Sequence, residues 1–203
     1  MKKLTPFVFM MAFMLAGCLQ QLQKKAEAEG HMPVDGLIIS LLPPESFGKQ
    51  IALTQSAIII YENNTHELLL VTELSGQSMV VVGLLPTGTR VFTITFDGEN
   101  LHMDGYAQAV EKLPAAYLLL DIQLSLWPYP VLQKHYQIAD ASKRFELLEH
   151  EGKRMRVLMT DKNPSIQIQY SGQPGYKSDI QYKHLQRKYE IELKTLDYQE
   201  LGE

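Results

Sequence analysis

The stretch Phe92-Thr93-Ile94-Thr95-Phe96 alternates apolar and hydroxyl side chains, and this period of two decides the fold class. Successive side chains of a β-strand point to opposite faces of a sheet, so the alternation predicts a strand with one buried and one hydrated face. The same pattern occurs in Ile166-Gln167-Ile168-Gln169-Tyr170 and in Tyr189-Glu190-Ile191-Glu192-Leu193-Lys194. The sequence therefore predicts a protein built mainly of half-buried β-strands.

Turn-forming dipeptides such as Ser75-Gly76, Asp97-Gly98 and Asn163-Pro164 separate these runs. Short turns between neighbouring strands produce hairpins, so we expect a curved antiparallel meander. The expected strands cover residues 50–61, 67–74, 78–84, 89–96, 99–104, 143–149, 154–160, 165–171, 178–183 and 187–196.

Three of the early strands are apolar on both faces. They contain Ala57-Ile58-Ile59-Ile60, Leu68-Leu69-Leu70-Val71 and Met79-Val80-Val81-Val82. A strand of this kind has apolar neighbours on each side. Two explanations stay open: a helix on one side with a lipid-filled or dry cavity, or simple packing inside a closed barrel.

One segment has a helical pattern that begins after Pro114, a residue suited to a first helical turn. Its apolar positions are Tyr117, Leu118, Leu120, Ile122 and Leu124. Because these positions lie on several faces, we expect the sheet to enclose the helix. The prolines of Leu126-Trp127-Pro128-Tyr129-Pro130 cannot continue it, so a buried aromatic corner is expected there.

The amino terminus has the pattern of an export signal. Lys2 and Lys3 precede an apolar run over residues 7–16, which as a helix rises only about 15 Å, half of the roughly 30 Å hydrocarbon core of a membrane. Such a run is typical of a signal peptide. Leu15-Ala16-Gly17-Cys18 resembles the bacterial lipobox, which implies cleavage before Cys18, a diacylglycerol on its thiol and an acyl chain on its amine.

This resemblance defines the expected organisation and location. Three acyl chains anchor a protein firmly, and Leu19 after the cysteine implies sorting to the outer membrane, facing the periplasm. Residues 1–17 form the expected signal peptide, 18–36 an acylated flexible tether, and 37–203 a single domain.

Composition excludes several protein classes. The 203 residues are 45% hydrophobic and 21% charged, which is typical of one globular domain. The net charge is −4, and it becomes −6 without residues 1–17, which hold two lysines and no acid. With no basic run, the chain is a poor nucleic-acid binder. A single cysteine excludes internal disulfides and Cys-rich metal sites.

The order of strands, one helical insertion, a Trp-bearing corner and further strands resembles the LolA/LolB group of lipoprotein carriers. The resemblance is closer to LolB and to a related family of uncharacterised bacterial lipoproteins. Three segments carry it: residues 82–92, residues 118–130 and residues 187–193. It implies an incomplete half-barrel, closed by one or two helices, with an apolar lumen that receives acyl chains.

The resemblance also implies candidate site residues. LolB carries an exposed, membrane-active leucine after its third strand, and here Thr87 stands nearest to it, so Leu84 and Leu85 are the candidate membrane-contact residues. The period of the strands and helix gives the candidate lumen lining, for which ordinary core packing is the alternative. These residues are Ile58, Ile60, Leu69, Val81, Phe92, Ile94, Phe96, Leu120, Leu124 and Trp127.

No catalytic motif stands out. G-x-S-x-G and H-E-x-x-H are absent from the sequence, and we expect neither an enzyme, a metal nor a cofactor beyond the lipid on Cys18. The expected function is to bind a lipid or acylated cargo and to help receive or insert it at the outer membrane, with a soluble LolA-like carrier as a partner. Two alternatives stay open: an interaction lipoprotein without a cavity, and an enzyme using His102, Asp104 and a tyrosine.

Overall fold

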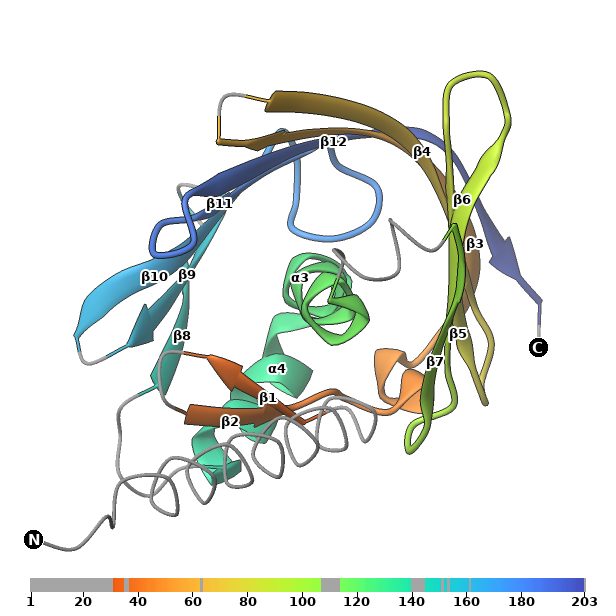
Figure 1. The fold of residues 1–203 in the computed structure, drawn as a ribbon. Helices are drawn as coiled ribbons and strands as arrows, with labels where there is room; N and C mark the ends of the chain where they lie inside the picture. The colour runs from red at the N-terminus through yellow and green to blue at the C-terminus, as the bar shows by residue number, and fades with distance from the viewer. Residues whose placement is uncertain are drawn as a thin grey trace, which may run out of the picture.

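One curved antiparallel sheet forms most of the molecule in the computed structural model, which describes residues 31–34, 37–62, 64–106, 114–139, 145–150, 152, 154–160 and 162–202. Its strand order is β7-β6-β5-β4-β3-β12-β11-β10-β9-β8, and its edge strands β7 and β8 do not pair with each other. The sheet curves around a helix (Figure 1). The expected fold class, a mainly β, unclosed half-barrel with helices, is confirmed.

The strand bounds lie close to the expected ranges. The sheet contains β3 (Gln50–Tyr61), β4 (Asn64–Leu74), β5 (Met79–Leu84), β6 (Arg90–Phe96), β7 (Leu101–Gly105), β8 (Phe145–His150), β9 (Met155–Thr160), β10 (Asn163–Tyr170), β11 (Ile180–His184) and β12 (Tyr189–Leu201). A separate hairpin consists of β1 (His31–Val34) and β2 (Leu37–Ser40), and a 3₁₀ helix, η1, spans Pro44–Phe47.

Helix α3 (Ala115–Leu126) lies inside the curve of the sheet (Figure 1), as its apolar residues on every face predicted. Every residue from Ala116 to Trp127 except Tyr117 is buried. Trp127 ends the helix and donates its backbone N–H to the carbonyl of Gln123. A second helix, α4 (Tyr129–Ala139), follows at once. The aromatic corner is present, and Pro130 falls in the first turn of α4, where the missing N–H removes no helical bond.

Polar side chains fix α3 at its middle and its end. The Gln123 amide accepts from the Leu42 backbone N–H and donates to the Leu42 carbonyl, at 2.9 and 2.8 Å. Arg156 on β9, 2% exposed, donates to the carbonyls of Leu124 and Trp127 at 3.0 and 2.8 Å and to Glu149 at 2.6 Å. These donors satisfy carbonyls that a helix end leaves open, so α3 is held at a defined place in the sheet.

The ends of the sheet can be assigned from its antiparallel register. The β3–β4, β5–β6 and β11–β12 turns all lie at the same end, and β7 also finishes there. Tyr117 in the first turn of α3 lies against Arg187 in the β11–β12 turn, so the first turn of α3 lies toward this end, which we call the entry end. The hairpin β1–β2 and helix α4 lie across the open side of the sheet (Figure 1).

The expected signal peptide, acylated cysteine and tether lie mostly outside the residues that the structure describes. Residues 1–17 and Cys18 lie outside the described residues. The expected tether, 18–36, overlaps strand β1, so at least its last part pairs with β2. In the described part of the chain, no helix has the length and apolar character required to cross a bilayer.

Candidate functional site

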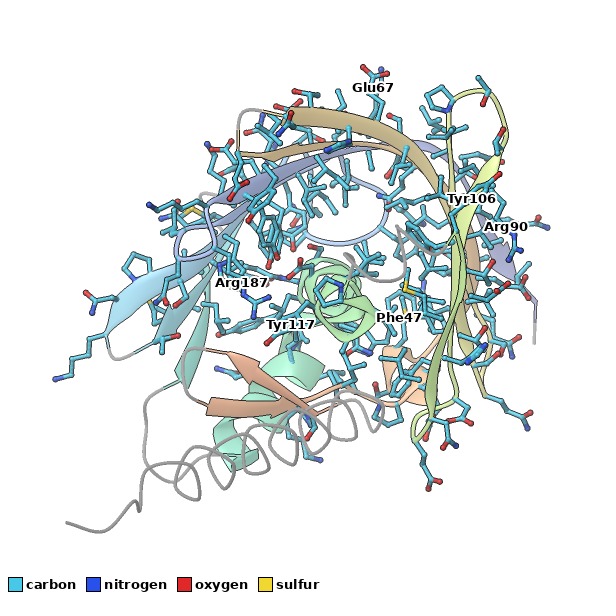
Figure 2. The ribbon with its side chains drawn as sticks, in the orientation of Figure 1. Phe47, Glu67, Arg90, Tyr106, Tyr117 and Arg187 are labelled. Carbon is cyan, nitrogen blue, oxygen red and sulfur yellow. The ribbon has the colours of Figure 1, made fainter. Side chains whose placement is uncertain are left out.

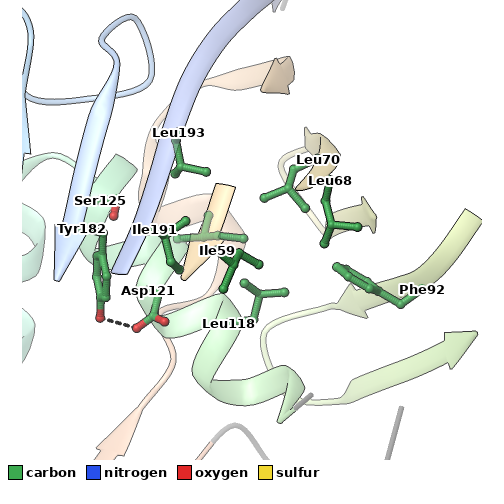
Figure 3. Close-up of a pocket in the computed structure, with 11 residues that line it drawn as sticks. Ile59, Leu68, Leu70, Phe92, Leu118, Asp121, Ser125, Tyr182, Ile191 and Leu193 are labelled. Carbon is green, nitrogen blue, oxygen red and sulfur yellow. Dashed lines mark hydrogen bonds between the residues drawn. The ribbon is translucent and has the colours of Figure 1, made fainter. Parts of the chain in front are cut away.

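A narrow cavity lies between α3 and the concave face of the sheet, toward the entry end (Figure 3). Side chains from β3, β4, β6, β11, β12 and α3 form its wall: Ile59, Leu68, Leu70, Phe92, Leu118, Asp121, Ile122, Ser125, Tyr182, Ile191 and Leu193. The cavity has a volume of about 30 Å³, and the space around it is about 460 Å³ when the open solvent at its mouth is included. The slot therefore admits a thin apolar chain only if lining side chains shift.

The close approach of the Phe92 ring to Gly83 positions this ring in the cavity wall. Gly83 on β5 lies opposite Phe92 on β6, and a Cβ added to Gly83 would come within 2.3 Å of the Phe92 ring. The ring therefore lies over a position without a side chain. A glycine inside a strand often marks such a close approach, and here it sets how far Phe92 projects toward the cavity.

One carboxyl group interrupts the apolar wall. Asp121 on α3 accepts hydrogen bonds from the hydroxyls of Tyr182 on β11 and Tyr189 on β12, one on each oxygen (Figure 3 shows the first). Burial raises the pKa of Asp121 to about 7, and the two tyrosine hydrogen bonds and the charge of Arg187 limit that rise. The three side chains join α3 to two strands of the sheet.

The pKa values of the two tyrosine hydroxyls in this cluster are also shifted. The Tyr182 and Tyr189 rings are stacked, with centroids 5.9 Å apart and an interplanar angle of 14°. Burial, together with the neighbouring Asp121 carboxylate, raises the pKa of both hydroxyls well above the usual value. Both therefore stay protonated at neutral pH and act as donors to Asp121.

Seven of the ten predicted lumen residues point into the half-barrel and fall into three groups. Phe92 lines the cavity. Val81, Ile94 and Phe96 lie on the same concave face and are 0–1% exposed, and they pack in the core beside the cavity. Leu120, Leu124 and Trp127, all at most 1% exposed, also belong to the core and do not line the cavity. Contact of any of these residues with a ligand stays a prediction.

Three predicted lumen residues lie on the wrong face. On β3 the core-facing positions are Ile51, Leu53, Gln55 and Ala57, so Ile58 and Ile60 point outward, and Ile60 is 36% exposed. Leu69 on β4 pairs with the outward-facing Ser56 and is outward as well. Odd-numbered and even-numbered residues are both apolar here, so the sequence does not show which of the two faces inward. The correct neighbours are Ile59 and Leu68.

Sequence reasoning also missed the cluster of Asp121, Tyr182 and Tyr189, which we call the polar wall of the cavity. Asp121 is the only ionisable carboxyl within the apolar segment Ala115–Leu126. Buried acids are rare unless paired, so a single aspartate in an apolar helix was an available signal. The tyrosine partners come from strands more than sixty residues later, and only the fold shows that they meet Asp121.

Leu84 and Leu85, the candidate membrane-contact residues, lie at the entry end. Leu84 is the last residue of β5, and Leu85 is 41% exposed in the tight β5–β6 turn, where its N–H donates to the Thr89 carbonyl at 2.8 Å. This turn projects from the sheet (Figure 1). The site has the exposure that contact with a membrane requires, and the contact itself stays a prediction.

The residues of the enzyme alternative lie apart from the cavity. His102 and Asp104 are exposed on the edge strand β7, and Asp104 pairs with Arg90 at 2.9 Å. The Arg90 hydrogen bond and charge lower the pKa of Asp104. Within the described residues, no three histidine, cysteine, aspartate or glutamate side chains converge on a common point.

Comparisons with known proteins place the chain in a family. A family model described as "Protein of unknown function (DUF3261)" matches residues 52–197, from β3 to β12. The chain belongs to this family. The match confirms the expected membership of an uncharacterised family, and the DUF3261 region includes every residue that lines the cavity.

Two further comparisons complete the picture. The solved structure of a putative outer membrane lipoprotein-sorting protein domain from Vibrio parahaemolyticus is similar with 9% sequence identity and a TM-score of 0.41, over 76% of this chain and 88% of that one. No curated protein matches this member of the DUF3261 family.

Proposed function

We propose that this protein is a lipoprotein of the outer membrane that holds an acyl chain of a lipid or acylated cargo between α3 and the concave face of the sheet. The observation that carries the proposal is the cavity itself, which is lined almost wholly by apolar side chains. The Cys18 lipid would anchor it on the periplasmic side, where a soluble LolA-like carrier would deliver the cargo and the Leu84–Leu85 turn would contact the membrane.

Burial of the chain is the proposed mechanism, with no bond made or broken. Each methylene removed from water contributes about 0.8 kcal/mol, so a chain of a dozen contributes roughly 10 kcal/mol before ordering costs are subtracted. The cavity, with a volume of about 30 Å³, has room for about two waters, since one water needs about 10–15 Å³. Entry of a chain therefore requires Leu118 and its neighbours to change rotamer.

Native mass spectrometry of residues 19–203, purified without detergent and followed by lipid extraction, tests the proposal. A bound acylated species near one per protein is the expected result. Leu68 and Leu69 on β4 provide a matched pair, because both are apolar and half-buried and they lie on opposite faces. Leu68→Gln should lose the bound species and Leu69→Gln should retain it. Equal loss or equal retention would contradict the cavity as the binding site.

A second function is favoured by one observation. The core around Trp127, 0% exposed, is tightly packed, with the indole N–H donating to Ser46 at 2.8 Å and Phe47 in edge contact at 5.0 Å. A filled core of this kind suits an interaction lipoprotein that docks partners on its surface. A protein mass that stays free of ligand when lipids are offered would favour this function over lipid binding.

A further inference from the structure

Arg187 occupies an unusual place beside the cavity. It lies in the β11–β12 turn at the entry end, and its guanidinium carbon is 3.4 Å from the centre of the Tyr117 ring on α3. Figure 2 shows the two side chains meeting between α3 and the sheet. The guanidinium thus lies over the face of the ring, and a cation held in this way still has N–H groups that can bind a ligand.

The guanidinium is adjacent to the polar wall of the cavity. Tyr117 lies one helical turn before Asp121, on the same face of α3. Tyr189, two residues after Arg187, donates to Asp121, and the charge of Arg187 lowers the pKa of that carboxyl. A ligand whose apolar chain fills the cavity would therefore bring its other end close to Arg187.

Arg187 differs from the other arginines that the structure describes. Arg90 donates to Asp104, Arg154 to the Ser171 carbonyl, and Arg156 to Glu149 and two carbonyls. For Arg187, no residue in the described ranges accepts a hydrogen bond from the guanidinium. Asp121 accepts from the hydroxyls of Tyr182 and Tyr189, one on each oxygen, and Arg187 acts on it through its charge. A half-buried guanidinium with free N–H groups is a site for an oxyanion.

We propose that Arg187 binds the anionic headgroup, a carboxylate or a phosphate, of the acyl-chain ligand held in the cavity. This inference rests on the proposed function and narrows its ligand to anionic amphiphiles. The planar fork of an arginine matches the paired oxygens of both groups, and neutral alcohols or esters offer no such charge. Tyr117 acts as a positioning residue, since it holds the guanidinium and does not itself touch the headgroup.

Photolabelling of the full chain in membranes tests the inference. The probes are a diazirine-bearing palmitic acid and the corresponding diazirine alcohol, and labelled peptides are quantified by mass spectrometry. The acid should label peptides of α3 and β12 about tenfold more than the alcohol does. Arg187→Gln should reduce labelling by the acid about tenfold, to the level of the alcohol, and Lys188→Gln, the same charge change one residue along, should leave it unchanged.

The remaining arms separate the possible failures. Arg187→Lys keeps the charge and should retain a third or more of the labelling; a loss as full as in Arg187→Gln would overturn the role of charge. Inorganic phosphate should not compete with the acid, whereas phosphatidic acid should, and equal competition would mean that Arg187 binds free anions. Equal labelling by acid and alcohol would overturn this inference alone. Labelling by neither would overturn the proposed function as well.

Discussion

Replacement of Asp121 by asparagine is expected to change how the stability of the fold depends on pH. The side chain keeps its shape and can still hydrogen-bond to Tyr182 and Tyr189, but it can no longer ionise. In the native protein, burial raises the pKa of Asp121 from 3.8 to about 7. Native Asp121 therefore binds a proton at pH values where the unfolded chain has already released it, and native stability must fall as the pH rises through this window.

The size of the effect follows from the shift. Each pKa unit corresponds to about 1.4 kcal/mol, so a shift of about three units gives a loss of about 4 kcal/mol between pH 4 and pH 7. Below pH 4 the carboxyl is neutral in both states and costs nothing, and above pH 7 the full cost is present. Relative to the native chain, Asp121→Asn should gain about 4 kcal/mol between these limits.

Urea unfolding at pH values from 4 to 8 measures this difference, with fluorescence of the single, fully buried tryptophan, Trp127, as the probe. Asp97→Asn is the control. Hydrogen bonds from the backbone and side chain of Asn100 and from the Glu99 backbone lower the pKa of Asp97 to about 2. Above pH 5, Asp97 is therefore ionised in the folded and in the unfolded chain. The stability of the variant should then change with pH in the same way as that of the native protein. A constant difference between Asp121→Asn and the native chain from pH 4 to pH 8 would refute the buried, proton-binding carboxyl.

Three further changes test the packing and the anchor. Gly83→Ala would place a Cβ against the Phe92 ring, so a loss of about 1–3 kcal/mol in urea unfolding is expected; unchanged stability would contradict the close approach. Arg156→Met leaves the mostly buried Glu149 without its partner and removes the donor to the carbonyls at the end of α3, which should cost about 3–5 kcal/mol; a loss under 1 kcal/mol would contradict the role of Arg156 as a helix cap. Cys18→Ala should shift the protein from the membrane fraction to a soluble or uncleaved form on fractionation, and normal membrane recovery would exclude the lipid anchor.

Local patterns predicted the strands well because the period of two and the turn dipeptides are properties of neighbouring residues. Local patterns do not predict which face of a strand points to the core when the odd-numbered and the even-numbered residues are both apolar. Ile58, Ile59 and Ile60 offer no local distinction, and the outward position of Ile58 becomes clear only from its cross-strand partners, Glu67 and Glu192. Those partners are set by the register of three strands, which the residues of one strand do not contain.

The half-barrel was expected to be closed by one or two helices, but the position of the second helix, directly after Trp127, was not predicted. Pro128 and Pro130 end any helix that approaches from the amino-terminal side, yet the same residues are well placed at the start of a new one. A single sequence shows that α3 must stop at Trp127, but not whether the chain then turns into a loop or a helix. The packing of α4 against β8 supplies the missing information.

The polar contacts of α3 explain why an apolar helix can border a cavity at all. A helix held only by apolar packing would settle against β4 and close the slot, because apolar surfaces gain free energy wherever they meet. Gln123 ties α3 to Leu42, Arg156 ties its end to β9, and Asp121 ties its middle to β11 and β12. These anchors join α3 to Leu42, β9, β11 and β12, and none of them reaches β4 or β6, which carry Leu68 and Phe92. The cavity of about 30 Å³ lies beside these two strands, and a chain that displaces Leu118 there would gain the most buried surface.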